Sequence, residues 1–207
     1  ERHLDDLRAI LLRQDGQEHA AYVLYGVSRI ENDPFSRTPR VRLTVREVLP
    51  VEEREVTSSD FQHISWKTDR FVQLLGKAGR EGIHLGIAHC HPGGPPAFSD
   101  QDNANEAQLT RLVTNRNGPD AFMASVLLCG DGTIVGRVWQ SDSKYVDFDA
   151  ISTVGPRWHR YSYESRGPAD PAFDRQTLAL GGDFTTLMRS LRFGVVGAGG
   201  TGSPLLQ

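Results

Sequence analysis

The chain has 207 residues, of which 38% are apolar, and this is enough to bury an ordinary core. Its net charge of −3 is spread along the sequence without a basic stripe, and its apolar runs fall far short of the roughly 20 residues that cross a bilayer, so neither nucleic acid nor membrane is expected as a partner. Since Cys90 and Cys129 are the two cysteines, we expect no disulfide framework and a reducing, cytoplasmic location.

The first part of the chain predicts a helix, two strands and a second helix. Apolar residues at helical spacing over residues 4–12 precede a buried strand, Ala20–Tyr25, which Gly26 closes. Apolar and polar residues then alternate from Val41 to Val45, as in a half-buried strand that ends at Pro50. We expect Ser58 or Ser59 to cap the next helix, whose apolar stripe consists of Phe61, Ile64, Phe71, Leu74, Leu75 and Ala78.

The next part predicts a strand over residues 83–91, a Gly/Pro loop over residues 92–98 and a helix over residues 99–115. The inward residues of that helix are expected to be Ala104, Ala107 and Leu112. Two further strands, over residues 121–128 and 133–139, flank a Gly-Asp-Gly hairpin signal. The fold class is therefore α/β, with a mixed or antiparallel sheet in a domain over residues 1–140.

The composition changes after Gln140. Residues 141–172 show no sustained period and predict a linker or an extended arm. Residues 173–191 have a helical pattern, and residues 192–196 predict a short strand that enters a glycine-rich turn.

The residues that indicate chemistry follow the pattern His-x-His-Pro-x6-Ser-x-x-Asp, from His89 to Asp102. Residues two apart on a strand project from the same face, so His89 and His91 can address one ion while Cys90 points away. A loop then returns the chain, and Asp102 can supply an oxygen ligand from the first turn of the next helix. Three ligands of N, N and O type leave one tetrahedral position open, which is the composition of a catalytic zinc site.

Each part of this pattern also has an ordinary structural interpretation. A His-x-His pair on a strand often serves packing and hydrogen bonding, and Ser99-x-x-Asp102 is also a helix capping box. Cys90 is expected to be a small core residue. In this order, however, and with Pro92 and a Gly/Pro loop between them, the parts together favour a metal site.

This pattern resembles the signature of the JAMM (JAB/MPN) metallopeptidases, and the order of elements resembles that family across residues 1–140. The resemblance implies a cytidine-deaminase-like mixed sheet flanked by helices. It also includes a Glu at the start of the first core strand, which Glu18 matches ahead of Ala20–Tyr25 and Gly26. By resemblance, His89, His91 and Asp102 hold zinc, Glu18 relays the proton from water to the leaving amine, and Ser99 stabilises the oxyanion.

These implied roles also agree with the chemistry of amide hydrolysis. The reaction needs a nucleophile, a polarised carbonyl and a proton for the departing nitrogen, and zinc with an adjacent carboxylate supplies all three. The ordinary alternative for Glu18 is a solvated residue at a turn. Other carboxylates, such as Glu31, Glu47 and Glu81, lack the position at the start of a strand.

The last residues form a second motif. A strand runs into Gly197-x-Gly199-Gly200-x-Gly202, with Ser203 as a cap, and this succession is typical of the phosphate-binding turn of a βαβ unit. Together with Arg175, it resembles the first βα element of a ThiF/MoeB-type adenylyltransferase, a Rossmann-like domain, over residues 173–207. The resemblance implies that these glycines and Arg175 contact ATP, but only in a complete parent protein, since the chain ends at Gln207.

A peptidase placed ahead of an activating enzyme points to one class of substrate. The resemblance implies a bacterial isopeptidase of deubiquitinase type that trims or releases a ubiquitin-like or sulfur-carrier protein, with a conjugating-enzyme-like protein as a further partner and oligomers formed through the C-terminal segment. The alternatives left open are a non-catalytic MPN scaffold, an accessory to the adenylyltransferase, and a zinc peptidase that acts on small peptides.

Overall fold

The computed structural model describes residues 1–32, 39–60, 64–156, 159–162 and 191–192. The chain divides into two compact units, Glu1–Tyr163 and Glu164–Gln207, and the fold given below is that of the first unit. The predicted Rossmann-like element, with Arg175 and the glycines at 197, 199, 200 and 202, lies outside the described residues.

A six-stranded sheet forms the centre of the first unit, with the strand order β2-β1-β5-β6-β7-β8. Neighbouring strands are antiparallel except for β5 and β6, which are parallel. The sheet is therefore mixed, which was one of the two arrangements left open by the predicted elements and the one that the family resemblance implied. Its strands are β1 (Ala20–Ile30), β2 (Arg40–Pro50), β5 (His84–His91), β6 (Met123–Cys129), β7 (Ile134–Ser141) and β8 (Lys144–Asp147).

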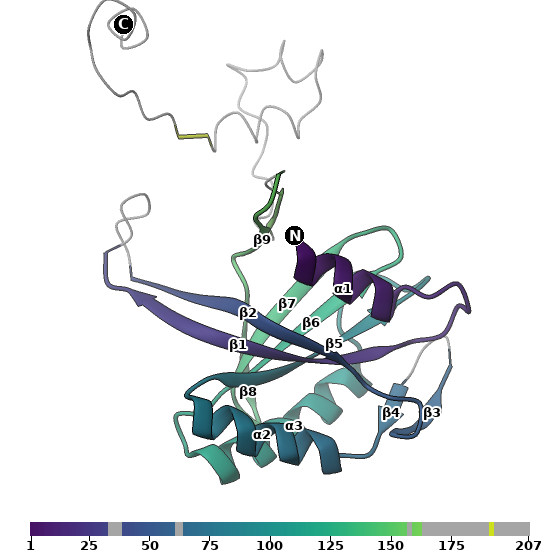
Figure 1. Cartoon of the computed structure of the whole chain (residues 1–207), viewed down its shortest axis with the longest axis horizontal. Coiled ribbons are helices and arrows are strands. Elements are labelled where there is room, and N and C mark those ends of the chain that lie inside the picture. The colour runs from purple at the N-terminus through teal and green to yellow at the C-terminus, as the bar shows by residue number, and fades with distance from the viewer. Residues whose placement is uncertain (33–38, 61–63, 157–158, 163–190, 193–207) are drawn as a thin grey trace, which may run out of the picture. The chain divides into compact units, whose positions relative to one another are not determined.

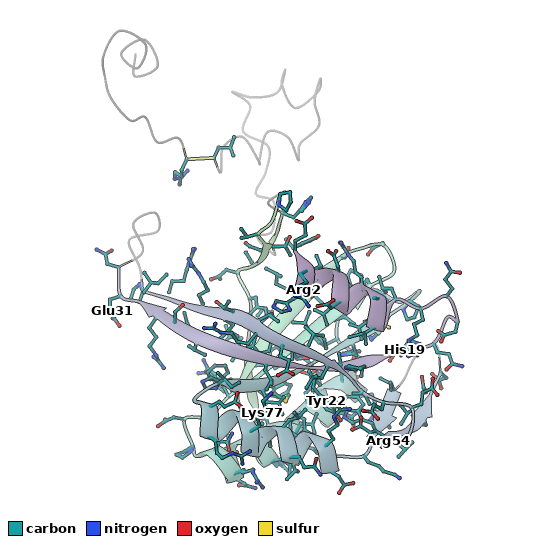
Figure 2. All side chains as sticks on the ribbon, viewed as in Figure 1. Arg2, His19, Tyr22, Glu31, Arg54 and Lys77 are labelled. Carbon is teal, nitrogen blue, oxygen red and sulfur yellow. The ribbon has the colours of Figure 1, made fainter. Side chains whose placement is uncertain are left out.

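Helices cover both faces of this sheet (Figure 1). Helix α1 (Arg2–Leu11) packs on one face, where Leu4, Leu7 and Leu11 join the buried residues of β1, β5 and β6. Helices α2 (Asp69–Glu81) and α3 (Asp100–Asn117) cover the other face. Figure 2 shows Tyr22 inside the domain between the sheet and these two helices.

Helix α2 forms because four apolar residues recur at positions i, i+3, i+4 and i+7 and are buried, namely Phe71, Leu74, Leu75 and Ala78. Gly82 ends the helix in the left-handed conformation, with φ of 64°, which glycine adopts without steric cost. The start of the helix was predicted wrongly. Thr68, not Ser58 or Ser59, is the N-cap, and Ile64 lies instead in a strand, β4 (Ile64–Trp66), which pairs with β3 (Val56–Ser59).

The reason for this error is a coincidence of spacing. Ile64 lies one heptad before Phe71, so it extends the apolar stripe of the helix although it reaches the core from a strand. The β-branched residues of this segment favour a strand. Phe61, which the prediction also placed in the helix, lies outside the described residues.

Helix α3 was predicted with nearly correct bounds, and its inner face was predicted in part, since Ala107 and Leu112 pack against the core but Ala104 does not. Ala104 is exposed, and Ala107 and Leu112 are partly buried. The buried residues are Glu106, Leu109, Thr110 and Val113. Two of these four are polar, so the apolar period of the sequence showed only part of the face that meets the sheet.

Regular structure continues beyond Gln140, where the sequence predicted an extended arm. Strand β8 pairs antiparallel with β7, and a hairpin of β9 (Ala150–Thr153) and β10 (His159–Ser162) follows. All four residues of β8 are exposed, which removes the alternating pattern that identifies a strand in a sequence. The domain boundaries proposed at residues 140 and 172 stay predictions.

This topology brings the predicted site residues to one place. Residue His89 of β5 lies opposite Ala20 of β1 in the antiparallel register, so the residues that precede β1 lie beside the end of β5. Helix α3 follows β5 directly and crosses over to the parallel strand β6. Within the described part of the chain, no helix has the length and hydropathy needed to cross a membrane.

The fold predicts how two leucines differ in their contribution to stability. Leu75 of α2 is fully buried, whereas Leu112 of α3 is only partly buried. We expect Leu75→Ala to lower the free energy of unfolding by about 2–5 kcal/mol, because it leaves a cavity in the core, and Leu112→Ala to lower it less. Urea denaturation of both variants measures this, and equal losses would contradict the placement of Leu75.

Candidate metal centre

The end of strand β5, the element before α3, carries two histidines on the same face of the sheet. His89 and His91 lie at the end of β5 with 4% and 7% of their surface exposed. Cys90, between them, points to the opposite face, where its Sγ donates to the Leu11 carbonyl at 2.9 Å and accepts from the His19 amide at 3.2 Å. The alternation of the strand therefore separates the imidazoles from the thiol, as predicted.

Helix α3 supplies the carboxylate. Ser99 caps the helix: the Asp102 amide donates to Ser99 Oγ at 3.1 Å, and the Ser99 amide donates to Asp102 Oδ2 at 2.7 Å. The Ser99 hydroxyl donates to the same Oδ2 at 2.7 Å. The capping box is thus present, and because all its contacts to the carboxylate use Oδ2, Asp102 Oδ1 is left to face His89.

The two imidazoles and this carboxylate could hold a metal ion, since one ligand atom from each lies within 4.8 Å of the others. His89 Nε2 is 3.2 Å from Asp102 Oδ1, but this pair does not have the geometry of a hydrogen bond. His89 Nε2 is consequently a buried nitrogen without a hydrogen-bond partner among the described residues. Such an orphaned atom is costly unless a ligand uses its lone pair, so the arrangement fits a cation.

The backbone also prepares His91 for such a role. His91 Nδ1 lies 3.3 Å from the Pro95 carbonyl, which can only accept, so this ring nitrogen carries the proton. Nε2 is then the nitrogen with the free lone pair, and it lies 3.6 Å from Asp102 Oδ2. Metal-binding histidines are commonly oriented in this way by a backbone carbonyl.

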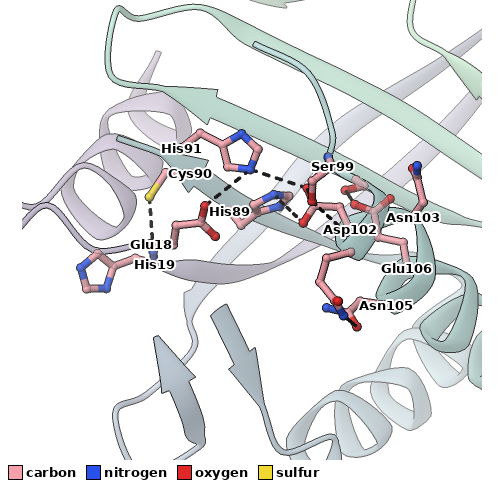
Figure 3. Close-up of polar contacts among 12 residues, drawn as sticks. Glu18, His19, His89, Cys90, His91, Ser99, Asp102, Asn103, Asn105 and Glu106 are labelled. Atoms are coloured by element: carbon pink, nitrogen blue, oxygen red, sulfur yellow. Dashed lines mark hydrogen bonds and ion pairs between the residues drawn. The ribbon is translucent and has the colours of Figure 1, made fainter. Parts of the chain in front are cut away.

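Glu18 lies beside the three potential ligands. Its Oε1 is 3.6 Å from His91 Nε2, and the residue is 2% exposed (Figure 3). Its backbone is fixed on both sides, since its amide donates to the Asp60 carbonyl at 2.8 Å and its carbonyl accepts from the Ser59 hydroxyl at 2.7 Å. The segment before β1 and strand β3 together therefore hold the Glu18 carboxylate at the group.

Burial and charge shift the acidities of these groups in different directions. Burial raises the pKa of Glu18, although the nearby imidazoles of His89 and His91 partly oppose this. Burial would also raise the pKa of Asp102, but the two imidazoles and the Ser99 hydroxyl hold it well below the usual range. The contact with Asp102 raises the pKa of His91. Without a metal, Asp102 is therefore ionised beside a buried Glu18 whose carboxyl is less acidic than usual.

A pocket of about 400 Å³ opens beside Glu18. It lies between the segment that precedes β1, including Gln17 and His19, and strand β3, including Thr57 and Ser58. Glu18 is one of the residues that line this pocket, whereas His89, His91 and Asp102 do not line it.

The structure brings together all five residues that the sequence singled out around the motif, namely Glu18, His89, His91, Ser99 and Asp102. The sequence did not reveal a buried ion pair next to them, between Glu106 of α3 and Arg137 of β7, with Nε and Oε2 at 2.9 Å. The available signal was weak: Arg137 stands between apolar residues of a predicted buried strand, in a place where a charge needs a partner.

Comparison with known proteins agrees with this geometry. The family model described as prokaryotic homologs of the JAB domain matches residues 1–141, which include both histidines, Asp102 and Glu18. No curated protein matches the chain. Since the matched residues make up more than half of the chain and carry the whole group, the protein belongs to the family of prokaryotic homologs of the JAB domain.

Proposed function

We propose that this JAB domain is a zinc-dependent peptidase or isopeptidase. The observation that carries the proposal is that the buried Glu18 carboxylate lies beside a group of two imidazoles and one carboxylate. Two nitrogen ligands and one oxygen ligand with an open position are the composition of catalytic zinc sites, whereas structural sites are closed by four protein ligands. The family includes JAMM metallopeptidases, which supports the same assignment.

The residues of the chain divide the chemistry between them. When bound by His89, His91 and Asp102, zinc supplies a Lewis acid for the scissile carbonyl and lowers the pKa of water. Glu18 accepts the proton of the attacking water and delivers it to the leaving nitrogen. Its raised pKa suits the first of these steps, because a more basic carboxylate takes the proton from water more readily.

Ser99 is the hydroxyl donor closest to the carboxylate ligand. In the structure this hydroxyl caps α3 and bonds Asp102. In the proposed reaction it donates to the oxygen that becomes negative in the transition state, a contact of the kind that contributes a large share of acyl-transfer catalysis.

The proposed substrate is the C-terminal tail of a ubiquitin-like or sulfur-carrier protein, which is cleaved during precursor processing or deconjugation. The pocket that Glu18 lines supports an extended chain on this side of the group, because strand β3 forms one of its walls, although His89, His91 and Asp102 do not line it. The glycine-rich motif at 197–202 supports the class of substrate through its resemblance to activating enzymes. A conjugating-enzyme-like protein is the further partner of this proposal.

The first prediction concerns the metal. The purified protein is expected to bind about one zinc ion per chain, and His91→Ala is expected to lose most of it because one of three ligands is gone. His84→Ala is the matched control, since His84 begins the same strand but stacks on Phe122 away from the group. Elemental analysis after dialysis measures the zinc, and equal zinc in wild type and His91→Ala would refute the ligand assignment.

The second prediction concerns the proton relay. Glu18→Gln is expected to keep zinc while hydrolysis falls on the order of 100- to 10,000-fold, because an amide cannot accept the proton. Glu47→Gln, which changes a surface ion pair with Lys77, serves as the control and should cleave at the wild-type rate. Single-turnover cleavage of a carrier with a C-terminal extension gives the rates, and unchanged cleavage by Glu18→Gln would exclude Glu18 as the base.

The third prediction concerns the tail of the substrate. We expect cleavage after Gly-Gly and none when both glycines of the carrier are replaced by Leu or Arg, because side chains would obstruct the close approach of the backbone to the metal. Mass spectrometry of the products from both carriers measures this. If the zinc-loaded protein cleaves both at similar rates, it is a general peptidase. If it cleaves neither these carriers nor short peptides, the scaffold alternative holds.

A further inference from the structure

We propose that Arg137 is a positioning residue of the metal centre, which fixes the first turns of α3 and thereby the place of Asp102. This inference rests on the proposed metal site but not on the identity of the substrate. Arg137 lies on β7 and is 2% exposed, and it is not one of the three potential metal ligands.

The guanidinium of Arg137 makes three different contacts with the segment that carries the third ligand. Its Nε donates to Glu106 Oε2 at 2.9 Å, and its Nη1 donates to Asn103 Oδ1 at 2.7 Å. Its face lies over the ring of Phe98, with 3.7 Å between the guanidinium carbon and the ring centroid. Phe98 precedes Asp102 in the sequence, and Asn103 and Glu106 follow it. The Arg137 side chain therefore contacts residues on both sides of this potential ligand.

Helix α3 needs this contact because its first turns have little apolar packing. Glu106 is the first buried residue of the helix, and the first buried apolar residue is Leu109. Leu109 lies about two turns, or roughly 10 Å, beyond Asp102. Near the metal centre the helix is therefore held to the sheet by polar contacts, and Glu106 also accepts from Ser125 Oγ at 2.6 Å and from the Trp139 indole.

The loop that precedes α3 is also positioned by the Arg137 side chain, through Phe98. The Phe98 ring lies 5.9 Å from the His89 ring and packs on the buried cluster of Leu127, Cys129 and Val135. Because Ser99 follows Phe98 directly, the place of Phe98 also sets the place of the helix cap. Arg137 thus connects the sheet with both the cap and the first turns of the helix.

Stability alone gives a weak reason for this buried ion pair. Replacement of a buried ion pair by apolar residues is often neutral or stabilising, and Nη2 of Arg137 is buried without a hydrogen-bond partner among the described residues. A role in orientation explains the arrangement better, because a planar guanidinium offers several donors in fixed directions.

The test compares two alanine variants of the same helix. Asn103→Ala removes the acceptor of Arg137 Nη1, whereas Asn105→Ala removes only a contact with Gln101 within the helix. Both change Asn to Ala in α3, so their effects on helix propensity are matched. The zinc dissociation constant, measured by competition with a chromophoric chelator, and the visible spectrum of the Co²⁺ form report on the metal centre, and urea denaturation of the metal-free protein reports on the fold.

We expect Asn103→Ala to weaken zinc binding about 10- to 100-fold and to change the Co²⁺ spectrum, with metal-free stability close to that of Asn105→Ala. Arg137→Lys keeps the charge but loses the fork and should weaken binding as well. The double variant with Asn103→Ala and Arg137→Lys should then bind zinc little more weakly than Arg137→Lys alone, because both substitutions remove the same contact.

Equal zinc affinity and equal spectra for Asn103→Ala and Asn105→Ala would overturn the inference. This comparison decides the test even when Arg137→Lys fails to fold. If wild type binds no metal, both the inference and the proposed function are wrong. If wild type binds zinc in the expected Asn103-dependent way but hydrolyses no amide, the positioning role stands and the proposed peptidase activity fails.

Discussion

The constraint on which this domain depends is the burial of four ionisable side chains in one space. Glu18, His89, His91 and Asp102 are buried or nearly so, and both carboxylates lie within 4 Å of an imidazole. Removing such groups from water is costly unless opposite charges or a metal compensate them. Hydrogen bonds from the imidazoles offset the burial cost of the carboxylates only in part, since His89 Nε2 has no hydrogen-bond partner among the described residues. A divalent cation would compensate all of them at once.

The fold serves this constraint by bringing together three segments that lie far apart in the sequence. The segment before β1 supplies Glu18, the end of β5 supplies the histidines, and the start of α3 supplies Asp102. Each segment is held by bonds of its own: Glu18 by the backbone of Asp60 and the hydroxyl of Ser59, and Asp102 by its capping box. The sheet and the helix cap therefore fix the group before any ligand arrives, which is what a preorganised site requires.

Much of this arrangement could be predicted from the sequence because it depends on local patterns. The two histidines share a face through the period of a strand, and Asp102 follows Ser99 at the spacing of a capping box. Most strands and helix bounds follow from apolar periodicity, whereas the mixed sheet was implied by the resemblance to a family. Glu18 needed the resemblance to a family, since nothing in a local pattern tells that the residues before β1 lie beside the end of β5.

The features that the sequence did not predict depend on contacts between distant residues. The inner face of α3 is set by Glu106, whose partners Ser125, Arg137 and Trp139 lie on two other strands. The late start of α2 depends on the pairing of β3 with β4, which local spacing cannot show. Strand β8 has no buried face at all, so its only signal is its hydrogen bonding to β7.

The exposed character of the two outermost strands has a consequence for the behaviour of the protein at high concentration. The edges of the sheet are β2 and β8, and an open edge is a template on which another chain can add a strand. Exposed charged residues stand on both of them, with Arg40, Arg42 and Arg46 on β2 and Lys144 and Asp147 on β8. A second copy that paired with β2 would bring arginines of both copies together, which opposes the addition of a strand at this edge. At β8 an antiparallel copy would instead place Lys144 opposite Asp147, and Tyr145 and Val146 are exposed there, so the charges protect only the β2 edge against aggregation.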